Sequence, residues 1–462
     1  MTESLTNHPT MSQLRARIDS GDLTPVGLVR SALARISRVE EAIQAFAAVF
    51  ADEALAVAQQ HRSATSPGQL WGIPVVVKDI YDVAGYRTGN GSLGAPQCLA
   101  AQDSEAVRRL RTTGAIILGK TTTHEYAYGV NTPPTRNPWS LDRIPGGSSG
   151  GTAAAIAAGV AAAGLGTDTG GSIRIPAALC GVTGHKPTFG LVSRSGVSAL
   201  SSTLDHTGPL GRTVDDTVAL LEAIAGHDPA DPYSSAGPVP DFRAEFGRGL
   251  AGLTIGVAEQ YFCDRLAPDV VAVFEQALRV LEAAGATITS VTFTDVELCP
   301  RVVDVVCGVE AAAWHVCQTG MNPEKFGPDV QEALRLGAAY TGVEYLEARR
   351  ARAAVIAGME ALFDSGADLL VSPTIAMTAP PYGSTHVELG GRTVSILDGI
   401  NALTVPANVT GMPALTVPAG FGSDGLPIGL QLMGRPGADA TVLGAGSAFE
   451  ALVDCVDRTP VL

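Results

Sequence analysis

The sequence predicts an α/β protein in which helices and strands are arranged in layers. From Gly72 onward, short apolar runs alternate with helical stretches, as in IPVVV, SEAVRRLRTTG and AIILGK. This alternation is typical of layered α/β folds. The chain has 462 residues, of which 46% are hydrophobic and 17% charged, so it can bury a substantial core.

The N-terminal residues 1–65 are expected to form a helical lead-in to this structure. Two helical patterns with capping signals occupy residues 11–62, and Thr24-Pro25 marks the start of the second. Residues 66–462 are expected to form one structural domain whose core motifs lie at 70–215. Within this domain, the best candidate boundary between the core motifs and the second half of the chain is the loop HDPADPYSSAGPVPD, which is rich in Pro, Asp and Ser.

The second half of the chain returns to the same alternation. GLTIGV and ATITSVTF predict strands around a helix at APDVVAVFEQALRVLEAAG, and DLLVSP, ALTVPAG and PIGLQLMG predict strands before a last helix. Between them, residues 300–365 read as a helical insertion. Cys307, Trp314, Cys317 and Tyr340 in this region could face a ligand or the core, and we favour the core. One sheet built from both ends of the chain explains this pattern best.

Charge and composition argue against several classes of function. The net charge of −15 leaves no excess of basic residues for nucleic acid or an anionic membrane. Seven scattered cysteines without a Cys-x-x-Cys pair favour reduced thiols, and eight histidines form no zinc motif. The N-terminus lacks the apolar core of a signal peptide, and no apolar run is suited to crossing a bilayer. We expect a cytoplasmic protein without metal or cofactor.

Lys78 is the first candidate catalytic residue. It is one of only four lysines and ends the apolar run GIPVVVKD, on the strand face of Val76. Desolvation against such a run lowers the pKa of a lysine, and a neutral amine is a base. Alternatively, Lys78 reaches solvent or pairs with Asp79.

Two glycine-rich loops carry candidate serines. In PGGSSGG, which runs straight into the helical pattern TAAAIAAGVAAAG, Ser148 and Ser149 could lie in a cleft at a helix N-terminus, or form an ordinary connector with a serine N-cap. In GTDTGGSIR, the amides from Thr169 to Ser172 could converge on an oxyanion, with Ser172 as the nucleophile. The alternative there is a tight turn with a helix cap.

Other glycine-loop chemistries fit less well. Neither loop supplies the lysine of a phosphate-binding loop, and no dinucleotide-binding fingerprint follows a strand. The elbow pattern Gly-x-Ser-x-Gly is present at residues 146–150, but loop sequence rather than a hydrophobic strand precedes it. The remaining interpretation is serine–lysine catalysis, in which a neutral Lys78 withdraws the proton of Ser172 through the hydroxyl of Ser148.

These motifs resemble the amidase signature family. The resemblance rests on the spacing of Lys78, Ser148 and Ser172, on GGSSGG and on GTDTGGSIRIPAALCGVTGHKPTFG, and it extends to the C-terminal NVTGMPALTVPAGF and LPIGLQLMG. It implies an α/β/α sandwich around a large mixed sheet. It also implies that Ser172 is the acylated nucleophile, that Lys78 is the base, and that a cis peptide bond joins Gly147 to Ser148.

The resemblance assigns further roles around these three residues. By resemblance, the oxyanion donors are Thr169, Gly170, Gly171 and Ser172, the loops are braced by Ser149, Asp168 and Arg174, and the backbone of Ala127 lines the substrate site.

We therefore expect an amidase that cleaves C–N bonds of small or aryl amides through an acyl-enzyme, with esters and carbamates (urethanes) as further substrates. The chain would act as a monomer or homodimer. The alternative is a partner-dependent enzyme, either the glutaminase subunit of a tRNA-dependent amidotransferase or a hydrolase of the biuret or allophanate type. Arg352 matches an arginine that holds glutamine, but Asn401 stands where an aspartate is expected. His185, in GHKP, replaces a usually apolar residue.

Overall fold

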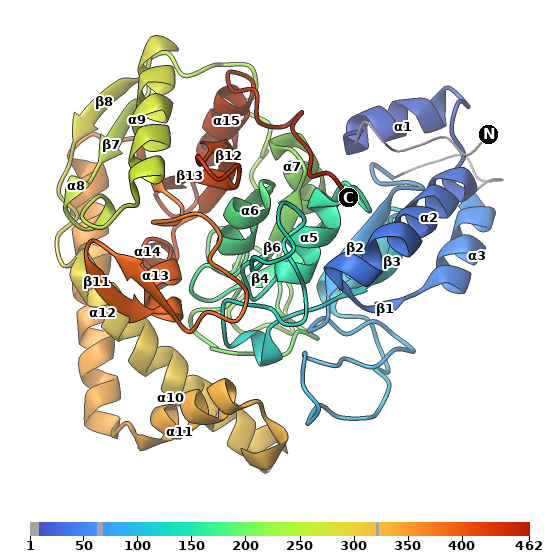
Figure 1. The fold of residues 1–462 in the computed structure, drawn as a ribbon, viewed down its shortest axis with the longest axis horizontal. Coiled ribbons are helices and arrows are strands. Elements are labelled where there is room, and N and C mark those ends of the chain that lie inside the picture. The colour runs from blue at the N-terminus through green and yellow to red at the C-terminus, as the bar shows by residue number, and fades with distance from the viewer. Residues whose placement is uncertain (1–8, 62–67, 320–322) are drawn as a thin grey trace.

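The centre of the structure is a mixed sheet of eleven strands, covered by helices on both faces (Figure 1). It is a computed structural model that describes residues 9–61, 68–319 and 323–462. The strands run in the order β1 (Phe46–Val49), β3 (Ile116–Thr121), β2 (Pro74–Lys78), β4 (Ala163–Asp168), β6 (His206–Gly211), β5 (Thr183–Lys186), β12 (Ala414–Phe421), β13 (Pro427–Gly434), β9 (Leu369–Pro373), β7 (Thr254–Val257) and β8 (Thr287–Ser290).

Parallel and antiparallel pairings occupy different regions of this sheet. Strand β2 is parallel to both β3 and β4, whereas the strands from β4 to β9 pair antiparallel. N-terminal and C-terminal parts of the chain meet where β5 pairs with β12. The predicted α/β/α sandwich with a mixed sheet built from both ends of the chain is confirmed.

Helices of different lengths form the outer layers. In chain order they are α1 (Met11–Asp19), α2 (Pro25–Ile43), α3 (Ala51–His61), α4 (Glu105–Thr112), α5 (Gly150–Ala157), α6 (Arg174–Cys180), α7 (Val214–Ile224), α8 (Glu259–Phe262), α9 (Pro268–Ala283), α10 (Cys299–Thr319), α11 (Pro328–Ala339), α12 (Gly342–Asp364), α13 (Ile396–Asn401), α14 (Val405–Thr410) and α15 (Asp439–Glu450).

Strand β2 shows how the two faces of the sheet are buried. Val75 and Val77 pack in the large core cluster that includes residues of α4 and α7, whereas Val76 packs with residues of α2, α3 and α5. Successive side chains of a strand point to opposite faces, so this apolar run needs helices on both sides. Lys78 has the parity of Val76, which directs it toward the start of α5.

The strands predicted from apolar runs are present, and the structure adds others that the sequence patterns do not predict. Strand β1 interrupts the expected N-terminal helices and pairs with β3. Strands β5 and β6 complete the centre of the sheet, and β10 (His386–Leu389) forms a separate hairpin with β11 (Arg392–Ser395). Helices α10, α11 and α12 occupy the expected insertion and lie together at one corner of the molecule (Figure 1).

Within the described residues, no helix is long and apolar enough to cross a membrane. The six cysteines whose side chains are described are all free. The described residues of the chain include no cluster of His, Cys, Asp and Glu able to hold a metal ion. The side chain of Cys317 lies outside the described residues.

Candidate active site

Lys78 lies fully buried at the end of β2 and bonds two hydroxyl groups. Its Nζ donates to Ser148 Oγ at 2.6 Å and to Thr167 Oγ1 at 2.9 Å, and its side chain is 0% exposed. Burial lowers the pKa of the Lys78 ammonium to about 7, although Asp168 and Asp205 act to raise it. Asp79 pairs with Lys120 at 2.7 Å instead, so the alternative partner considered for Lys78 is excluded.

Ser148 and Ser149 immediately precede α5. The peptide bond between Gly147 and Ser148 is cis, as predicted. Ser149 stands at the N-cap position of α5, but its hydroxyl makes no cap bond. Instead, Ser149 Oγ donates to the Thr167 carbonyl and accepts from the Thr167 amide, both at 3.2 Å. These bonds fasten the loop to strand β4, and the bracing role of Ser149 stays a prediction.

Ser172 lies in the turn between β4 and α6, beside that loop. The amide of Ser149 donates to the Ser172 carbonyl at 3.2 Å, which ties the two glycine-rich loops together. Gly171 has a φ of 131°, and a Cβ there would come within 2.2 Å of Thr404 Oγ1, so the position requires glycine. This turn brings Ser172 to the wall of a cavity.

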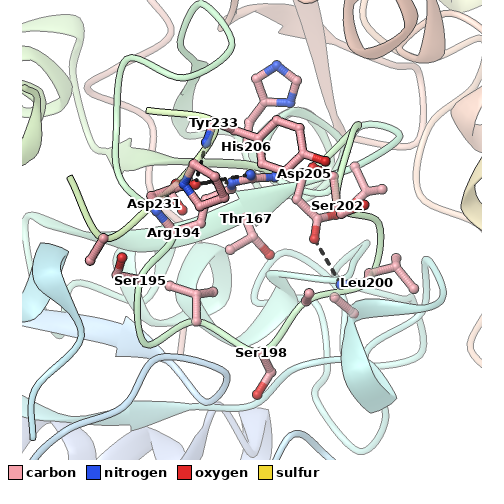
Figure 2. A pocket seen from close by; sticks show the side chains of 17 residues that line it. Thr167, Arg194, Ser195, Ser198, Leu200, Ser202, Asp205, His206, Asp231 and Tyr233 are labelled. Carbon is pink, nitrogen blue, oxygen red and sulfur yellow. Dashed lines mark hydrogen bonds and ion pairs between the residues drawn. The ribbon is translucent and has the colours of Figure 1, made fainter. Parts of the chain in front are cut away.

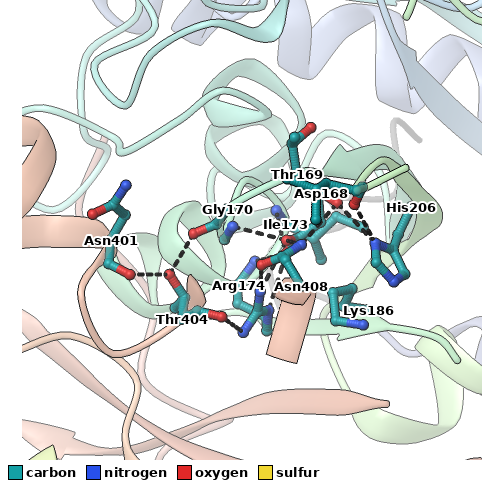
Figure 3. Close-up of polar contacts among 12 residues, drawn as sticks. Asp168, Thr169, Gly170, Ile173, Arg174, Lys186, His206, Asn401, Thr404 and Asn408 are labelled. Atoms are coloured by element: carbon teal, nitrogen blue, oxygen red, sulfur yellow. Dashed lines mark hydrogen bonds and ion pairs between the residues drawn. The ribbon is translucent and has the colours of Figure 1, made fainter. Parts of the chain in front are cut away.

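Asp168 and Arg174 form the interior support of the Ser172 turn (Figure 3). Both side chains are 0% exposed, and Arg174 Nη2 lies 2.9 Å from Asp168 Oδ1. Arg174 also donates to the Thr404 carbonyl at 2.8 Å, to Gln431 Oε1 at 2.6 Å and to Asn408 Oδ1 at 2.7 Å. Burial acts to raise the pKa of the Asp168 carboxyl, but the Arg174 guanidinium holds it below its usual range. The turn is thereby anchored to helix α14, its N-cap and strand β13.

The four amides expected to stabilise an oxyanion are not equivalent. Gly171 donates its amide hydrogen to Asp168 Oδ1 at 2.8 Å, so this donor is already used. Within the described part of the chain, the amides of Thr169, Gly170 and Ser172 donate to no other protein group. Thr169 is held by its side chain, which donates to Asp205 Oδ1 at 2.6 Å. Three of the four predicted donors are therefore free to bind an oxyanion.

The cavity beside Ser172 has a volume of about 210 Å³ and mainly apolar walls. Both Ala127 and Asn401 contribute to these walls. Cys307 is one of the insertion residues that we expected to face the core. It is buried but also lines this cavity, so the expectation is only partly met. The lining residues are Ala127, Tyr128, Gly129, Val130, Thr169, Gly170, Ser172, Ile175, Leu200, Pro300, Val303, Asp304, Cys307, Gly308, Ala333, Leu336, Gly337, Leu397, Asp398 and Asn401.

A second cavity of about 230 Å³ shares Ala127, Thr169 and Leu200 with the first (Figure 2). Its walls include Thr167, so it reaches the second hydroxyl partner of Lys78. Arg194 and Asp231 form an ion pair at its edge, with 3.3 Å between Nη2 and Oδ1. The two cavities therefore meet beside the turn that carries Ser172.

Several residues of this site are not predicted from the sequence. Thr167 and Asp205 influence Lys78 directly, and Thr404 and Asn408 support the Ser172 turn from α14 and its N-cap. Asp205, Thr404 and Asn408 lie far from the glycine-rich motifs in the chain, and only folding brings them together. Thr167 belongs to the segment GTDTGGSIR, so the sequence pattern itself contains the signal that could identify this residue.

The register of β2 and β4 explains the position of Thr167. Val77 of β2 pairs with Leu165 of β4 in parallel, so the ends of the two strands lie side by side. Lys78 is the last residue of β2, and Thr167 is the last residue but one of β4. The neighbouring strand therefore carries the Thr167 hydroxyl to the Lys78 ammonium.

Arg352 and Asn401 occupy different surroundings. Arg352 Nε donates to the Val409 carbonyl at 2.8 Å and Nη2 to the Thr203 carbonyl at 3.2 Å. Arg352 is absent from the lining of both cavities, whereas Asn401 lines the first. His185 pairs with Asp439 at 3.1 Å and connects β5 to α15, away from the candidate active site.

Comparison with known proteins identifies the family of this chain. Residues 27–443 match the family model described as Amidase. The chain is 39% identical to an amidase of Pseudomonas putida over 461 aligned positions, covering 98% of both chains. It is 37% identical to a glutamyl-tRNA(Gln) amidotransferase subunit of Roseiflexus sp. (strain RS-1) over 490 positions, covering 99% of both.

A solved structure also resembles this chain over nearly its whole length. The structure of a bacterial aryl acylamidase of the amidase signature family superposes with a TM-score of 0.90 at 26% identity, covering 99% of this chain and 100% of that one. The family model spans most of the chain, and the relatives cover nearly its whole length. The chain therefore belongs to the amidase family and is an amide-hydrolysing enzyme.

Proposed function

We propose that this enzyme hydrolyses small or aryl amides through an acyl-enzyme, with Ser172 as nucleophile, Ser148 as proton relay and Lys78 as base. The observation that carries the proposal is the buried Lys78 Nζ, which lies 2.6 Å from Ser148 Oγ. Because burial lowers the pKa of Lys78 to about 7, a large fraction of the amine is neutral near pH 7 and can accept a proton.

In the acylation step, Ser172 Oγ attacks the carbonyl carbon of the substrate. Its proton passes to Ser148 Oγ as the Ser148 proton passes to Lys78 Nζ. The free amides of Thr169, Gly170 and Ser172 stabilise the negative oxygen of the tetrahedral intermediate. Returning along the same relay, the proton reaches the leaving nitrogen as the C–N bond breaks. Water then attacks the acyl-enzyme by the same route, and esters and carbamates can follow this sequence as well.

The cavity beside Ser172 favours substrates without a negative charge. Its described lining residues include no Lys, Arg or His, and the two charged side chains among them are the carboxylates Asp304 and Asp398. Asp304 is paired with Arg301 at 3.1 Å, so an anionic group entering there would meet the Asp398 carboxylate and no cationic lining residue. The guanidinium of Arg352 donates to two backbone carbonyls, and Arg352 does not line the cavity. A carboxylate such as that of free glutamine therefore lacks a partner in this cavity, and uncharged amides fit it better.

Two measurements test this proposal. A fluorophosphonate probe is expected to label the wild-type chain and to fail with Ser172→Ala. Ser198→Ala is the matched control, because Ser198 lines only the second of these two cavities and should remain labelled. The purified chain alone is then assayed with anilides, carbamates and glutamine. Unchanged turnover of the best substrate by Ser172→Ala contradicts the assignment, and preferential turnover of glutamine contradicts the substrate class.

A further inference from the structure

Two hydrogen bonds tie helix α11 to the short segment that precedes Ala127, and we call this pair of bonds the brace. His124 Nε2 lies 2.9 Å from Asp329 Oδ2, in the first turn of α11. The amide of Gly327, the N-cap residue of α11, donates to Glu125 Oε2 at 2.7 Å. Both bonds reach the same end of the helix, so together they fix its position relative to this segment.

His124 is itself held firmly by the segment. The amides of Asn131 and Thr132 both donate to His124 Nδ1 at 3.4 Å. Because Nδ1 accepts these bonds, the ring hydrogen is on Nε2 and can be donated to Asp329. A Cβ on Gly129 would lie 2.3 Å from the ring, so the chain closes tightly around the imidazole. The amide of His124 also donates to the Ser148 carbonyl at 3.1 Å, next to the proposed proton relay.

The backbone that follows His124 has an unusual conformation. Tyr126 and Ala127 have φ values of 47° and 62°, in the left-handed region that residues other than glycine seldom adopt. Such a conformation persists only where surrounding contacts hold it. Here the amide of Tyr126 donates to the Asn90 carbonyl at 2.8 Å, and the brace holds the two residues just before it.

The two parts joined by the brace both form walls of the cavity beside Ser172. The segment contributes Ala127, Tyr128 and Gly129, and α11 contributes Ala333, Leu336 and Gly337. At the far end of α11, a Cβ on Gly337 would lie 2.1 Å from the Gly308 carbonyl oxygen, so α11 packs directly against α10. The helix is thus fixed at both ends, by glycine packing at one and by the brace at the other.

We propose that His124 and Asp329 are specificity-determining positioning residues, which set the distance between the two walls and so the size of the group admitted beside Ser172. Neither residue lines the cavity, so both act through Ala127 and α11. This inference rests on the proposed function of the same site. Without the His124–Asp329 bond, the wall formed by α11 can retreat and admit a larger acyl group.

The test compares Asp329→Ala with Asp329→Asn, which keeps an oxygen able to accept from His124. Glu332→Ala is the matched control, because Glu332 lies on the same helix and pairs with Arg335 at the surface. The substrates are 4-nitroacetanilide and its bulkier benzoyl analogue, which share a leaving group. For Asp329→Ala, we divide kcat/KM for the benzoyl substrate by kcat/KM for the acetyl substrate. We expect this ratio to rise about tenfold because KM for the benzoyl substrate falls, as for other changes of pocket size. Asp329→Asn and Glu332→Ala are expected to keep the wild-type ratio.

An unchanged or lower ratio in Asp329→Ala, or an equal loss with both substrates, overturns the inference. His124→Phe keeps a ring in place but removes the donor, and it supplies a second variant if Asp329→Ala fails to fold. Failure of the proposed function has a different signature, because Ser172→Ala would then retain activity on both anilides. If only the brace is wrong, Ser172→Ala is inactive while Asp329→Ala keeps the wild-type ratio.

Discussion

Lys78 and Lys120 lie on neighbouring strands and are both buried, yet they have different surroundings. Lys78 is 0% exposed and bonds the hydroxyls of Ser148 and Thr167. Lys120 is 1% exposed and pairs with the Asp79 carboxylate at 2.7 Å. In the parallel register Lys120 lies beside Val77, one position before Lys78. Because adjacent strand residues point to opposite faces, the two ammonium groups leave the sheet on opposite sides.

Burial alone therefore does not assign a chemical role to a lysine. Burial lowers the pKa of both lysines, but Asp79 acts directly to raise that of Lys120. A carboxylate in contact stabilises the charged form, whereas neutral hydroxyls do so less. We interpret Lys120 as a structural cation and Lys78 as the group that can exchange a proton. Four predictions test this distinction.

The largest expected effect is on activity when Lys78 is replaced. Lys78→Met keeps the length of the buried chain but removes the base, so kcat/KM is expected to fall about 10³-fold, within the range of general acid–base catalysis. The measurement is hydrolysis of 4-nitroacetanilide by the variant, with circular dichroism to verify folding. Activity within a few fold of wild type would show that another group withdraws the proton.

Lys120→Met is expected to affect stability instead. It leaves the Asp79 carboxylate buried without its cation, which typically costs about 3 kcal/mol. Urea unfolding measures this loss, and activity per folded molecule should remain near that of wild type. The double variant Asp79→Asn with Lys120→Met removes both charges and should recover part of the stability. A loss of activity as large as that of Lys78→Met would remove the distinction between the two lysines.

A smaller effect is expected at the second hydroxyl partner of Lys78. Thr167→Val keeps the branched shape but removes the acceptor at 2.9 Å from Lys78 Nζ. We expect kcat/KM to fall about tenfold, because one hydrogen bond to a charged group is worth about 1.5 kcal/mol or more. Thr167→Ser retains the hydroxyl and is the matched control. Equal losses in both variants would indicate that packing rather than hydrogen bonding matters.

The smallest effect concerns the pH dependence. Because the pKa of Lys78 is about 7, kcat/KM should rise with pH through that value as the amine loses its proton. Asp205 acts to raise the pKa of Lys78, so Asp205→Asn is expected to move the midpoint to lower pH. The asparagine keeps one acceptor oxygen, which can serve either Thr169 or the amides of Leu200 and Ser201, so circular dichroism is used to verify folding. A midpoint that stays in place would show that the Asp205 charge does not reach Lys78.

The same pKa makes the stability of the fold depend on pH. The folded-state pKa of Lys78 lies below the usual value of 10.5, so between about 7 and 10.5 the unfolded chain binds the proton and the folded chain does not. The contribution of Lys78 to stability therefore rises with pH across this window and is unfavourable below it. The proposed base therefore carries a cost in folding, which fits a functional role.

Some parts of the fold are accessible from the sequence because local patterns determine them. The apolar run at 73–77 can be buried on both faces only as an internal strand, and β2 occupies that place. By contrast, β5 has the polar sequence TGHK, and its strand state depends on pairing with β6 and β12. Likewise β1 is short and mostly exposed, and pairing with β3 decides its conformation.

For the candidate site, the sequence alone shows which residues can do the chemistry: a lysine after an apolar strand and two serines in glycine-rich loops 24 residues apart. The tertiary fold selects their partners. It pairs Asp79 with Lys120, places hydroxyls against Lys78, uses the Gly171 amide on Asp168 and sets α11 across from Ala127. The physical reason is that residue type and local pattern fix chemical capacity and secondary structure, whereas pKa values and cavity shape depend on charges and walls contributed by distant segments.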